Sequence, residues 1–365
     1  MDAVLTGTAA FGVTHSLTGR RWVWREAEDR VAQAIAQRTG VPDLVGRLLA
    51  ARGVPVDRAA DFLDPTLRVW LPDPSILTDM DRAAARIAEA VRSGETVGIF
   101  GDYDVDGACS GALMALGLDQ LGTRTINYVP DRLREGYGPN APALLGLAAQ
   151  GASLIVCVDC GTAAHEALAA LAGRADIIVL DHHKIEGPTP DILATVNPNR
   201  PDDTSGLGSI CAATVTFLTL IATRRALRKQ DFFAGRAELD LLAMLDLVAL
   251  ATVCDVMPLT GLNRALVTQG LKVMAERARP GIAALLDVAH VTEAPNAATC
   301  GFALGPRINA AGRIARADLG LRALLAEDPA SAIEHARALD DINRERQSVE
   351  AGLLDEAMQI AEAQF

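Results

Sequence analysis

The sequence predicts an α/β protein: a doubly wound, mainly parallel sheet with an N-terminal helical extension and a C-terminal helical segment. Two observations support this prediction. Between residues 96 and 196, short apolar segments alternate with helical patterns, which is the rhythm of βαβ units. From residue 209 onward the apolar spacing is helical, which indicates that helices follow the sheet.

The expected elements follow in chain order. Prolines divide residues 20–75 into short segments, and an amphipathic helix over 80–92 precedes the sheet. The expected strands are 96–100, 124–129, 153–158, 177–180 and 192–196. The expected helices between and after them are 108–121, 140–149, 163–172, 209–228, 238–253, 263–278, 281–288 and a long helix from 329 to the end.

Composition limits the possible classes of protein. The chain has 365 residues, of which 50% are hydrophobic and only 4% aromatic, so aliphatic side chains must fill a large core. No apolar run approaches the length of a membrane span, and the N-terminus lacks the pattern of a signal peptide. We therefore expect a soluble, cytoplasmic protein without membrane contact.

Charge and cysteine usage narrow the classes further. The net charge of −12 argues against non-specific nucleic-acid binding, but it does not exclude a nuclease, because metal-binding carboxylates count as negative until metal binds. The six cysteines are scattered, which argues against a disulfide framework. Cys157 and Cys160 form a C-x-x-C in a strand-like context without a second pair, which speaks against zinc or redox chemistry.

The stretch 96–108, TVGIFGDYDVDGA, is the most informative in the chain. An apolar strand ends at Gly101, and carboxylates follow at alternating positions, Asp102, Asp104 and Asp106. Open α/β folds build their sites at the carboxyl ends of strands. Three like charges this close repel one another, and a divalent cation would offset them. Taken alone, the stretch is equally consistent with a solvated acidic turn.

Metal-type side chains stand at three further segment ends. They are Asp159 after a strand, Asp181-His182-His183 after the next strand, and Asp255 after the helix that ends near residue 252. A single aspartate in such a place is usually a helix cap, and a His-His pair usually lies in a loop. Their joint occurrence at neighbouring strand ends predicts a site for two metal ions that share a carboxylate.

These four motifs resemble, in order, those of the DHH phosphoesterases. Further segments resemble the RecJ family of bacterial single-strand-specific exonucleases, and the resemblance runs from about residue 40 to the end. The RecJ-like segments are 128–132, 135–138, 196–199, 251–259 and 305–313.

The resemblance implies a set of metal ligands and catalytic groups. The ligands would be Asp102, Asp104, Asp106, Asp159, His182 and Asp255, with Asp159 as the bridge. His183 would lie beside the leaving oxygen or the scissile phosphate, either as a residue behind the metal ligands or as a proton donor. Asp181 would orient His182 in preference to binding metal directly. Mixed imidazole and carboxylate ligation favours Mn²⁺, with Mg²⁺ as the alternative.

The resemblance also implies groups that bind the substrate. Arg307, Asn309 and Arg313 lie in a Gly-containing segment that we interpret as a loop for the 5′-terminal phosphate. Arg132 and Arg134, beside Tyr137, would grip the strand and stack a base. A solvated surface loop is the simpler alternative for both segments.

The predicted function is a metal-dependent 5′→3′ exonuclease that degrades single-stranded DNA to mononucleotides in DNA repair and recombination. The two cations would hold the scissile phosphate and activate the attacking water. The expected partners are single-stranded DNA, a single-strand-binding protein and a helicase, and the chain is expected to be a monomer. The alternatives are a DHH enzyme for small substrates (oligonucleotides, cyclic dinucleotides or pyrophosphate) and a non-catalytic replication scaffold.

Three parts are expected along the chain: a helical extension over 1–75, a DHH catalytic domain over 76–300, and a phosphate-binding loop with a long connecting helix over 301–365. The Gly-Gly-His motif that the resemblance places in a further domain is missing from the sequence. We therefore expect the long helix to lead into a C-terminal domain that these 365 residues do not include.

Overall fold

A computed structural model describes residues 9–132, 134–314 and 316–364 of the chain. They divide into two compact units, Met1–Val69 and Trp70–Phe365. Each unit is described by itself.

The N-terminal unit is a small helical cluster. Its helices are α1 (Asp29–Thr39), α2 (Asp43–Ala51) and α3 (Ala59–Leu63), with the 3₁₀ turns η1 (Ala10–Gly12) and η2 (Val56–Arg58); α4 (Leu67–Trp70) begins at its end. Ile35, Leu49, Val54 and Ala59 form its core. The α1 and α2 helices pack closely because Gly46 lies against the backbone of Ala32, where a Cβ would come within 2.4 Å of the carbonyl oxygen.

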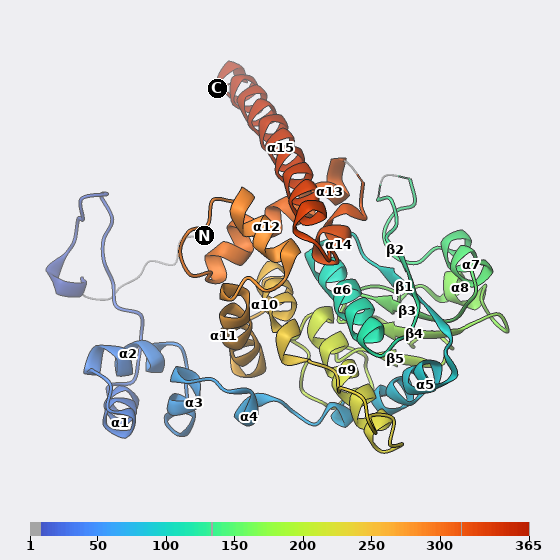
Figure 1. Cartoon of the computed structure of the whole chain (residues 1–365). Coiled ribbons are helices and arrows are strands. Elements are labelled where there is room, and N and C mark those ends of the chain that lie inside the picture. The colour runs from blue at the N-terminus through green and yellow to red at the C-terminus, as the bar shows by residue number, and fades with distance from the viewer. Residues whose placement is uncertain (1–8, 133, 315, 365) are drawn as a thin grey trace. The chain divides into compact units, whose positions relative to one another are not determined.

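The second unit is built on a five-stranded parallel sheet, which confirms the predicted fold class (Figure 1). Its strands are β1 (Thr96–Gly101), β2 (Thr125–Tyr128), β3 (Ala152–Val158), β4 (Asp176–Leu180) and β5 (Ala194–Val196). Their order across the sheet is β2-β1-β3-β4-β5, and each neighbouring pair is parallel. The carboxyl ends of all five strands therefore lie at one edge of the sheet. The predicted site residues that directly follow β1, β3 and β4 lie at this edge.

Helices cover both faces of this sheet (Figure 1). One face carries α5 (Met80–Ser93), α6 (Val105–Gln120) and α9 (Ala212–Arg228); the other carries α7 (Ala141–Ala149) and α8 (His165–Ala169). The α6 helix is apolar on nearly all sides and almost wholly buried, because α9, α10 (Leu245–Cys254) and α14 (Leu319–Leu324) pack around it. The first carboxylate motif is thereby anchored on a rigid element.

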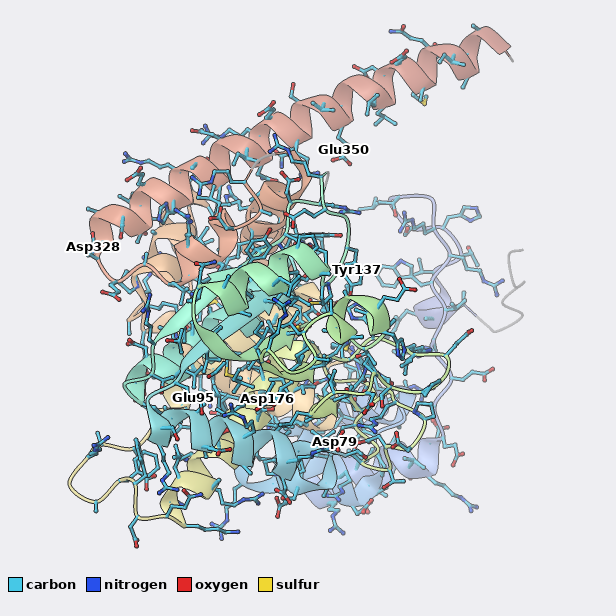
Figure 2. The ribbon with its side chains drawn as sticks, turned by 90° about the vertical axis from the view of Figure 1, so that its right-hand side faces the viewer. Asp79, Glu95, Tyr137, Asp176, Asp328 and Glu350 are labelled. Atoms are coloured by element: carbon cyan, nitrogen blue, oxygen red, sulfur yellow. The ribbon has the colours of Figure 1, made fainter. Side chains whose placement is uncertain are left out.

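The opposite edge of the sheet is held by ion pairs. Arg86 of α5 donates from Nε to Asp176 at 2.6 Å and from Nη2 to Glu95 at 2.7 Å. Glu95 and Asp176 stand at the amino ends of β1 and β4, and Figure 2 shows them near one another and away from Tyr137. Structural ion pairs and the candidate site thus occupy opposite edges.

Helices make up the rest of the unit. In order they are η3 (Pro74–Ile76), η4 (Leu242–Met244), α10 (Leu245–Cys254), α11 (Gly261–Ala275), α12 (Pro280–Val288), the π-helical η5 (Thr299–Leu304), α13 (Gly305–Ile314), α14 (Leu319–Leu324) and α15 (Pro329–Gln364). The first part of α15 packs on α12, α13 and α14, and its last part projects from the body (Figure 1). Within the described residues, no helix has the length and apolar character needed to cross a membrane.

The interpretation of residues 305–313 as a loop was wrong, because they form most of α13. Gly305, Pro306 and Gly312 suggested a loop, since glycine and proline are unfavourable within helices. Buried Ile308 and neighbouring alanines pack α13 against α14 and α15, and this burial outweighs the weak local propensity.

Substitutions at two helical glycines, Gly107 of α6 and Gly146 of α7, test how closely α6 packs against the turn that carries Asp102. A Cβ on Gly107 would come within 2.5 Å of the backbone of Asp102, whereas one on Gly146 of α7 would meet nothing within 4 Å. We expect Gly107→Ala to displace the motif and lower the melting temperature. Gly146→Ala should instead raise stability slightly, by about 0.5–1 kcal/mol. Thermal unfolding followed by circular dichroism measures both, and equal melting temperatures for the two variants would contradict the proposed close packing.

Candidate metal centre

The turn after β1 places the first three carboxylates. Asp104 caps α6 by accepting a hydrogen bond from the backbone N–H of Gly107 at 3.0 Å. The Asn309 Oδ1 atom accepts from the backbone N–H of Val105 at 3.1 Å, so α13 helps to hold the same turn. Asp102 is 4% exposed and lies just beyond β1.

Asp106 is held by the start of another helix. Its two carboxylate oxygens accept backbone hydrogen bonds from Ala212 at 2.7 Å and from Ala213 at 2.8 Å. These N–H groups open α9, so the positive end of the helix dipole faces a side chain that is 1% exposed. The arrangement fixes the direction of Asp106 while each oxygen keeps a lone pair.

Asp159 occupies the centre of the site. It follows β3, is 1% exposed, and has a φ of 60°, which turns the chain sharply at the strand end. The left-handed conformation is uncommon for residues other than glycine, although aspartate and asparagine tolerate it best. Its backbone N–H donates to the carbonyl oxygen of Leu180 at 2.9 Å, which keeps the turn attached to β4.

The histidine of the third motif points into the same space. His182 Nε2 lies 3.6 Å from Asp106 Oδ2, 3.4 Å from Asp159 Oδ1 and 3.5 Å from Asp255 Oδ2. Asp255 reaches this position because it follows α10 directly. Carboxylates from three separate segments therefore converge on one imidazole nitrogen.

The potential ligand atoms form three overlapping groups, each with its atoms within 4.8 Å of one another. The groups are Asp102 with Asp104 and Asp159, Asp106 with His182 and Asp255, and Asp159 with His182 and His183. All six sequence-predicted metal ligands thus belong to a group. Asp159 is shared between groups, as a bridging carboxylate would be.

The chemistry of these oxygens fits divalent cations. Asp102 Oδ1, Asp159 Oδ1 and Asp255 Oδ2 are buried and have no hydrogen-bond partner among the described residues. A buried carboxylate oxygen without a partner is costly, and a cation would satisfy it. Mixed carboxylate and imidazole donors suit Mn²⁺ and also permit Mg²⁺.

The metal-free carboxylates resist ionisation. Burial raises the pKa of Asp102 to about 7 and that of Asp106 to about 8, and the charge of Asp104 adds to both shifts. Burial likewise raises the pKa of Asp255 to about 6 and that of Asp159 well above its usual value. Cation binding must therefore release protons.

Asp181 behaves differently at the same edge. Although burial opposes ionisation, the hydrogen bond from His183 and the contacts with Thr162 lower the pKa of Asp181 to about 2. His183 Nδ1 lies 2.8 Å from Asp181 Oδ1, and this hydrogen bond raises the pKa of His183 to about 9. We expected Asp181 to orient the ring of His182, but it orients the ring of His183. From His182 it accepts a hydrogen bond of the backbone N–H and none of the ring.

Two asparagines and a threonine brace the third motif, and sequence reasoning gave them no role. Thr162 donates to Asp181 from both its backbone N–H at 3.1 Å and its hydroxyl at 2.6 Å. Asn197 donates to the carbonyl oxygen of His183 at 2.9 Å, and Asn199 donates to that of His182 at 2.5 Å. The sequence did offer one indication of this role: Asn197 and Asn199 directly follow β5, at the same edge of the sheet as the acidic residues.

An aromatic loop lies beside the imidazoles. The Tyr137 hydroxyl donates to the backbone oxygen of Asp159 at 3.2 Å and lies 3.2 Å from His183 Nδ1. The guanidinium of Arg132 lies 5.0 Å from the ring centroid of Tyr103, a cation–π contact. Both predicted strand-gripping residues are thus near the carboxylates, with Tyr137 54% exposed.

A pocket of about 770 Å³ opens next to His183. Tyr137, Thr162, Asp181 and Lys184 contribute to its lining. The pocket therefore adjoins the exposed side of the third motif and leaves His183 open to solvent.

Arg307 is not presented freely to a phosphate, contrary to our expectation. Its Nε and Nη2 donate to Asp340 Oδ1 at 2.9 Å and 2.8 Å, and its Nη1 donates to the carbonyl oxygen of Ala303 at 2.7 Å. This arrangement ties α13 to α15. The side chain of Arg313 lies outside the described residues.

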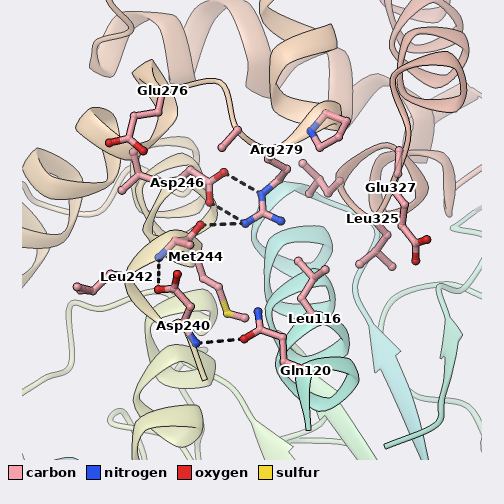
Figure 3. Close-up of a pocket in the computed structure, with 16 residues that line it drawn as sticks. Leu116, Gln120, Asp240, Leu242, Met244, Asp246, Glu276, Arg279, Leu325 and Glu327 are labelled. Carbon is pink, nitrogen blue, oxygen red and sulfur yellow. Dashed lines mark hydrogen bonds and ion pairs between the residues drawn. The ribbon is translucent and has the colours of Figure 1, made fainter. Parts of the chain in front are cut away.

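A second pocket, of about 710 Å³, lies elsewhere, between α6, the start of α10 and the end of α14 (Figure 3). Its lining guanidinium, Arg279, is held by Asp246 at 2.8 Å. Asp240, Glu276 and Glu327 add negative charge, and none of them belongs to a metal-type group among the residues that the structure describes. An acidic lining of this kind does not favour a phosphate, so it is not part of the candidate site.

The charge of the metal-free site should make stability depend on pH. The folded-state pKa values of Asp102, Asp106 and His183 lie above their ordinary values, so the folded protein holds extra protons. Their contribution is complete at low pH and is lost as the pH rises through about 7 to 9. We expect the melting temperature in EDTA to fall between pH 6.5 and 8.5, and the stabilisation by added Mn²⁺ to grow over this range.

Calorimetry with and without metal provides the measurement for this pH dependence. The variant Asp102→Asn, which mimics the protonated acid, should flatten the dependence. Asp287→Asn, at a surface ion pair with Arg277, should leave it unchanged. A metal effect that stays constant from pH 6.5 to 8.5 would contradict the electrostatic description.

The Arg307–Asp340 pair should contribute to stability. Asp340 is 4% exposed and also pairs with Arg344, so Arg307→Ala leaves a buried carboxylate with one partner. We expect a loss of roughly 2–3 kcal/mol, partly recovered in the double variant with Asp340→Asn. Arg316→Ala, which removes an exposed pair, should cost under about 0.5 kcal/mol. Urea denaturation distinguishes these outcomes; equal losses for Arg307→Ala and Arg316→Ala would be inconsistent with a buried pair.

Comparisons with known proteins agree with this geometry. Residues 96–252 match the model of the DHH family, N-terminal domain. The single-stranded-DNA-specific exonuclease RecJ of Dickeya dadantii (strain 3937) is 39% identical over 328 residues, which are 88% of this chain and 56% of that protein. The chain thus spans little more than half the length of that relative.

Two solved structures are similar over most of the chain. The crystal structure of exonuclease RecJ bound to manganese is 34% identical, has a TM-score of 0.69, and is matched over 77% of this chain and 69% of its own. The structure of RecJ in complex with Mn²⁺ from Thermus thermophilus is 30% identical, has a TM-score of 0.76, and is matched over 91% of this chain and 46% of its own.

Proposed function

This chain is a member of the RecJ family of DHH proteins, and from that membership we infer that it is a metal-dependent exonuclease that hydrolyses single-stranded DNA 5′→3′ to mononucleotides. One observation supports the chemistry above all others. Carboxylates from separate segments converge on Asp159, and buried oxygens among them lack hydrogen-bond partners within the described part of the chain. The direction of digestion and a role in DNA repair and recombination rest on the resemblance.

The proposed cofactors are two divalent cations, with Mn²⁺ favoured over Mg²⁺. Asp106, His182 and Asp255 would hold one, Asp102 and Asp104 the other, and Asp159 would belong to both. When bound, the cations lower the pKa of a water molecule and neutralise charge on the phosphate.

His183 is the proposed proton donor to the leaving 3′ oxygen. Its hydrogen bond to Asp181 raises the pKa of His183 to about 9, so the imidazolium persists at neutral pH. Since Nδ1 is occupied by Asp181, Nε2 is the atom that can give its proton to the leaving group. Thr162 and Asn197 support this orientation through Asp181 and the His183 backbone.

Contacts with the strand are proposed for the aromatic loop and for α13. Tyr137 would stack a base while Arg132 would contact a phosphate. The carboxamide N–H groups of Asn309 can donate to the terminal phosphate while Oδ1 stays on Val105. Arg307 could contact the phosphate only by giving up its ion pair with Asp340. If it does so, Arg307→Ala should raise the KM for strands with a 5′ phosphate and leave the KM for strands with a 5′ hydroxyl unchanged.

The proposed partners beyond DNA are a single-strand-binding protein and a helicase, with the chain as a monomer. The complete set of metal-type residues speaks against a non-catalytic scaffold. Hydrolysis of a long single strand compared with a dinucleotide and pyrophosphate tests the substrate class. Preference for the small substrates would replace the proposed exonuclease by the small-substrate alternative.

The central aspartate provides the direct test of catalysis. Asp159→Asn keeps the size and tolerates the left-handed backbone, but it removes the shared charge. We expect cleavage of single-stranded DNA to fall by at least about a hundredfold. Asp231→Asn is the matched control, because Asp231 also has a positive φ, of 54°, and lies outside the ligand groups. Near wild-type cleavage by Asp159→Asn would exclude the bridging role.

A further inference from the structure

The N-terminal unit exposes a group of aromatic side chains. Residues 9–25, here called the aromatic hairpin, fold back through an antiparallel bridge between Ala9 and Val23. Phe11 is 76% exposed, Trp22 51% and Trp24 41%. Such large apolar surfaces, when grouped on a surface, mark binding sites.

Contacts within the unit hold these rings in place. The ring centroids of Phe11 and Trp24 lie 4.9 Å apart at an angle of 57°. Arg47 of α2 lies with its guanidinium carbon 5.2 Å from the Trp24 centroid and pairs with Asp29 at 2.9 Å. Trp22 is fixed through its backbone, which accepts from the N–H of Ala10 at 2.9 Å and donates to Val13 at 3.1 Å. The rings are therefore presented by an ordered backbone.

The charge of the aromatic hairpin is opposite to that of the whole chain. Residues 9–25 contain Arg20, Arg21 and Arg25 and no acidic residue, whereas the net charge of the protein is −12. All three arginines are exposed. Two of the three tryptophans in a chain with only 4% aromatic residues also lie here. Arginines between exposed aromatic rings are the combination that binds single strands, through phosphate contacts and base stacking.

We propose that the aromatic hairpin is a binding site for single-stranded DNA, with bases stacked on Trp22 and Phe11 and phosphates at Arg20 and Arg25. The choice of DNA as the strand rests on the proposed function. None of its residues belongs to a metal-ligand group, so its proposed role is to hold the strand and not to hydrolyse it.

Fluorescence measurements on the full chain test the site. In EDTA, which prevents hydrolysis, oligo(dT) should quench the tryptophan emission of the protein and of Trp70→Phe alike. By anisotropy of labelled oligo(dT), Trp22→Ala and Phe11→Ala should each weaken binding roughly tenfold. Trp22→Phe should restore most of the affinity, since phenylalanine still stacks. The same sequence as duplex should bind more weakly, because its base faces are covered.

Two matched controls separate stacking from other causes. Leu17 is a fully exposed apolar side chain of the same hairpin that cannot stack like a ring, so Leu17→Ala should bind as wild type. The double variant Arg20→Gln/Arg25→Gln should lower the slope of log affinity against log salt by about 1.4, whereas Arg38→Gln in α1 should not. Melting curves of the variants verify folding.

Either of two results would overturn the proposal: wild-type affinity in Trp22→Ala, or an equal loss in Leu17→Ala, which would indicate an apolar surface for a protein. The outcome is independent of catalysis. Hairpin-dependent binding without any cleavage by the wild type would reject the proposed exonuclease alone. Cleavage by the wild type with unchanged binding in Trp22→Ala would reject the aromatic hairpin alone.

Discussion

Repulsion among buried carboxylates is the constraint on which the rest of this structure depends. Asp102, Asp106 and Asp159 are each at most 4% exposed and lie at one edge of the sheet. Burial and mutual repulsion both favour their neutral forms. Hydrogen bonds offset this repulsion only in part. The first N–H groups of α9 bind Asp106, whereas Asp102 and Asp159 each retain an oxygen without a partner among the described residues. The repulsion that remains is what a cation relieves.

The same residue type serves an opposite purpose one strand away. Asp181 is as buried as Asp159, yet its pKa falls to about 2, because the imidazole of His183 and both donors of Thr162 face it. Its charge is then used locally, to keep His183 protonated. Asp159, whose Oδ1 has no such partner in the described part of the chain, is left for the metal. The facing imidazole of His183 thus distinguishes Asp181 from Asp159, although both carboxylates are equally buried.

The sequence allowed much of this to be predicted, because strand ends in a parallel sheet are brought together by topology alone. Apolar runs located all five strands, and an acid directly after a run was enough to place Asp102 and Asp159 at one edge. What could not be predicted depends on side-chain direction or on distant packing. No spacing tells that Asp181 faces the ring of His183 instead of that of His182. The helix α13 and the pairing of Arg307 with Asp340 arise from contacts with α15, 33 residues further along the chain, and glycine-rich local sequence points the other way.

Net charge is a poor guide to the ligand of such a protein, because the charges that matter act locally. An excess of acidic residues repels a polyanion only within about a Debye length, roughly 8–10 Å at physiological salt. At the carboxyl edge of the sheet, Asp102 and Asp106 carry little negative charge near pH 6.5 because their pKa values are raised, and bound cations would neutralise what remains. Arginines beside aromatic rings, at Arg132 with the half-buried Tyr103 and in the aromatic hairpin, add attraction over the same short range. A net charge of −12 therefore does not exclude binding of a polyanion, because close contacts and bound cations act within that range.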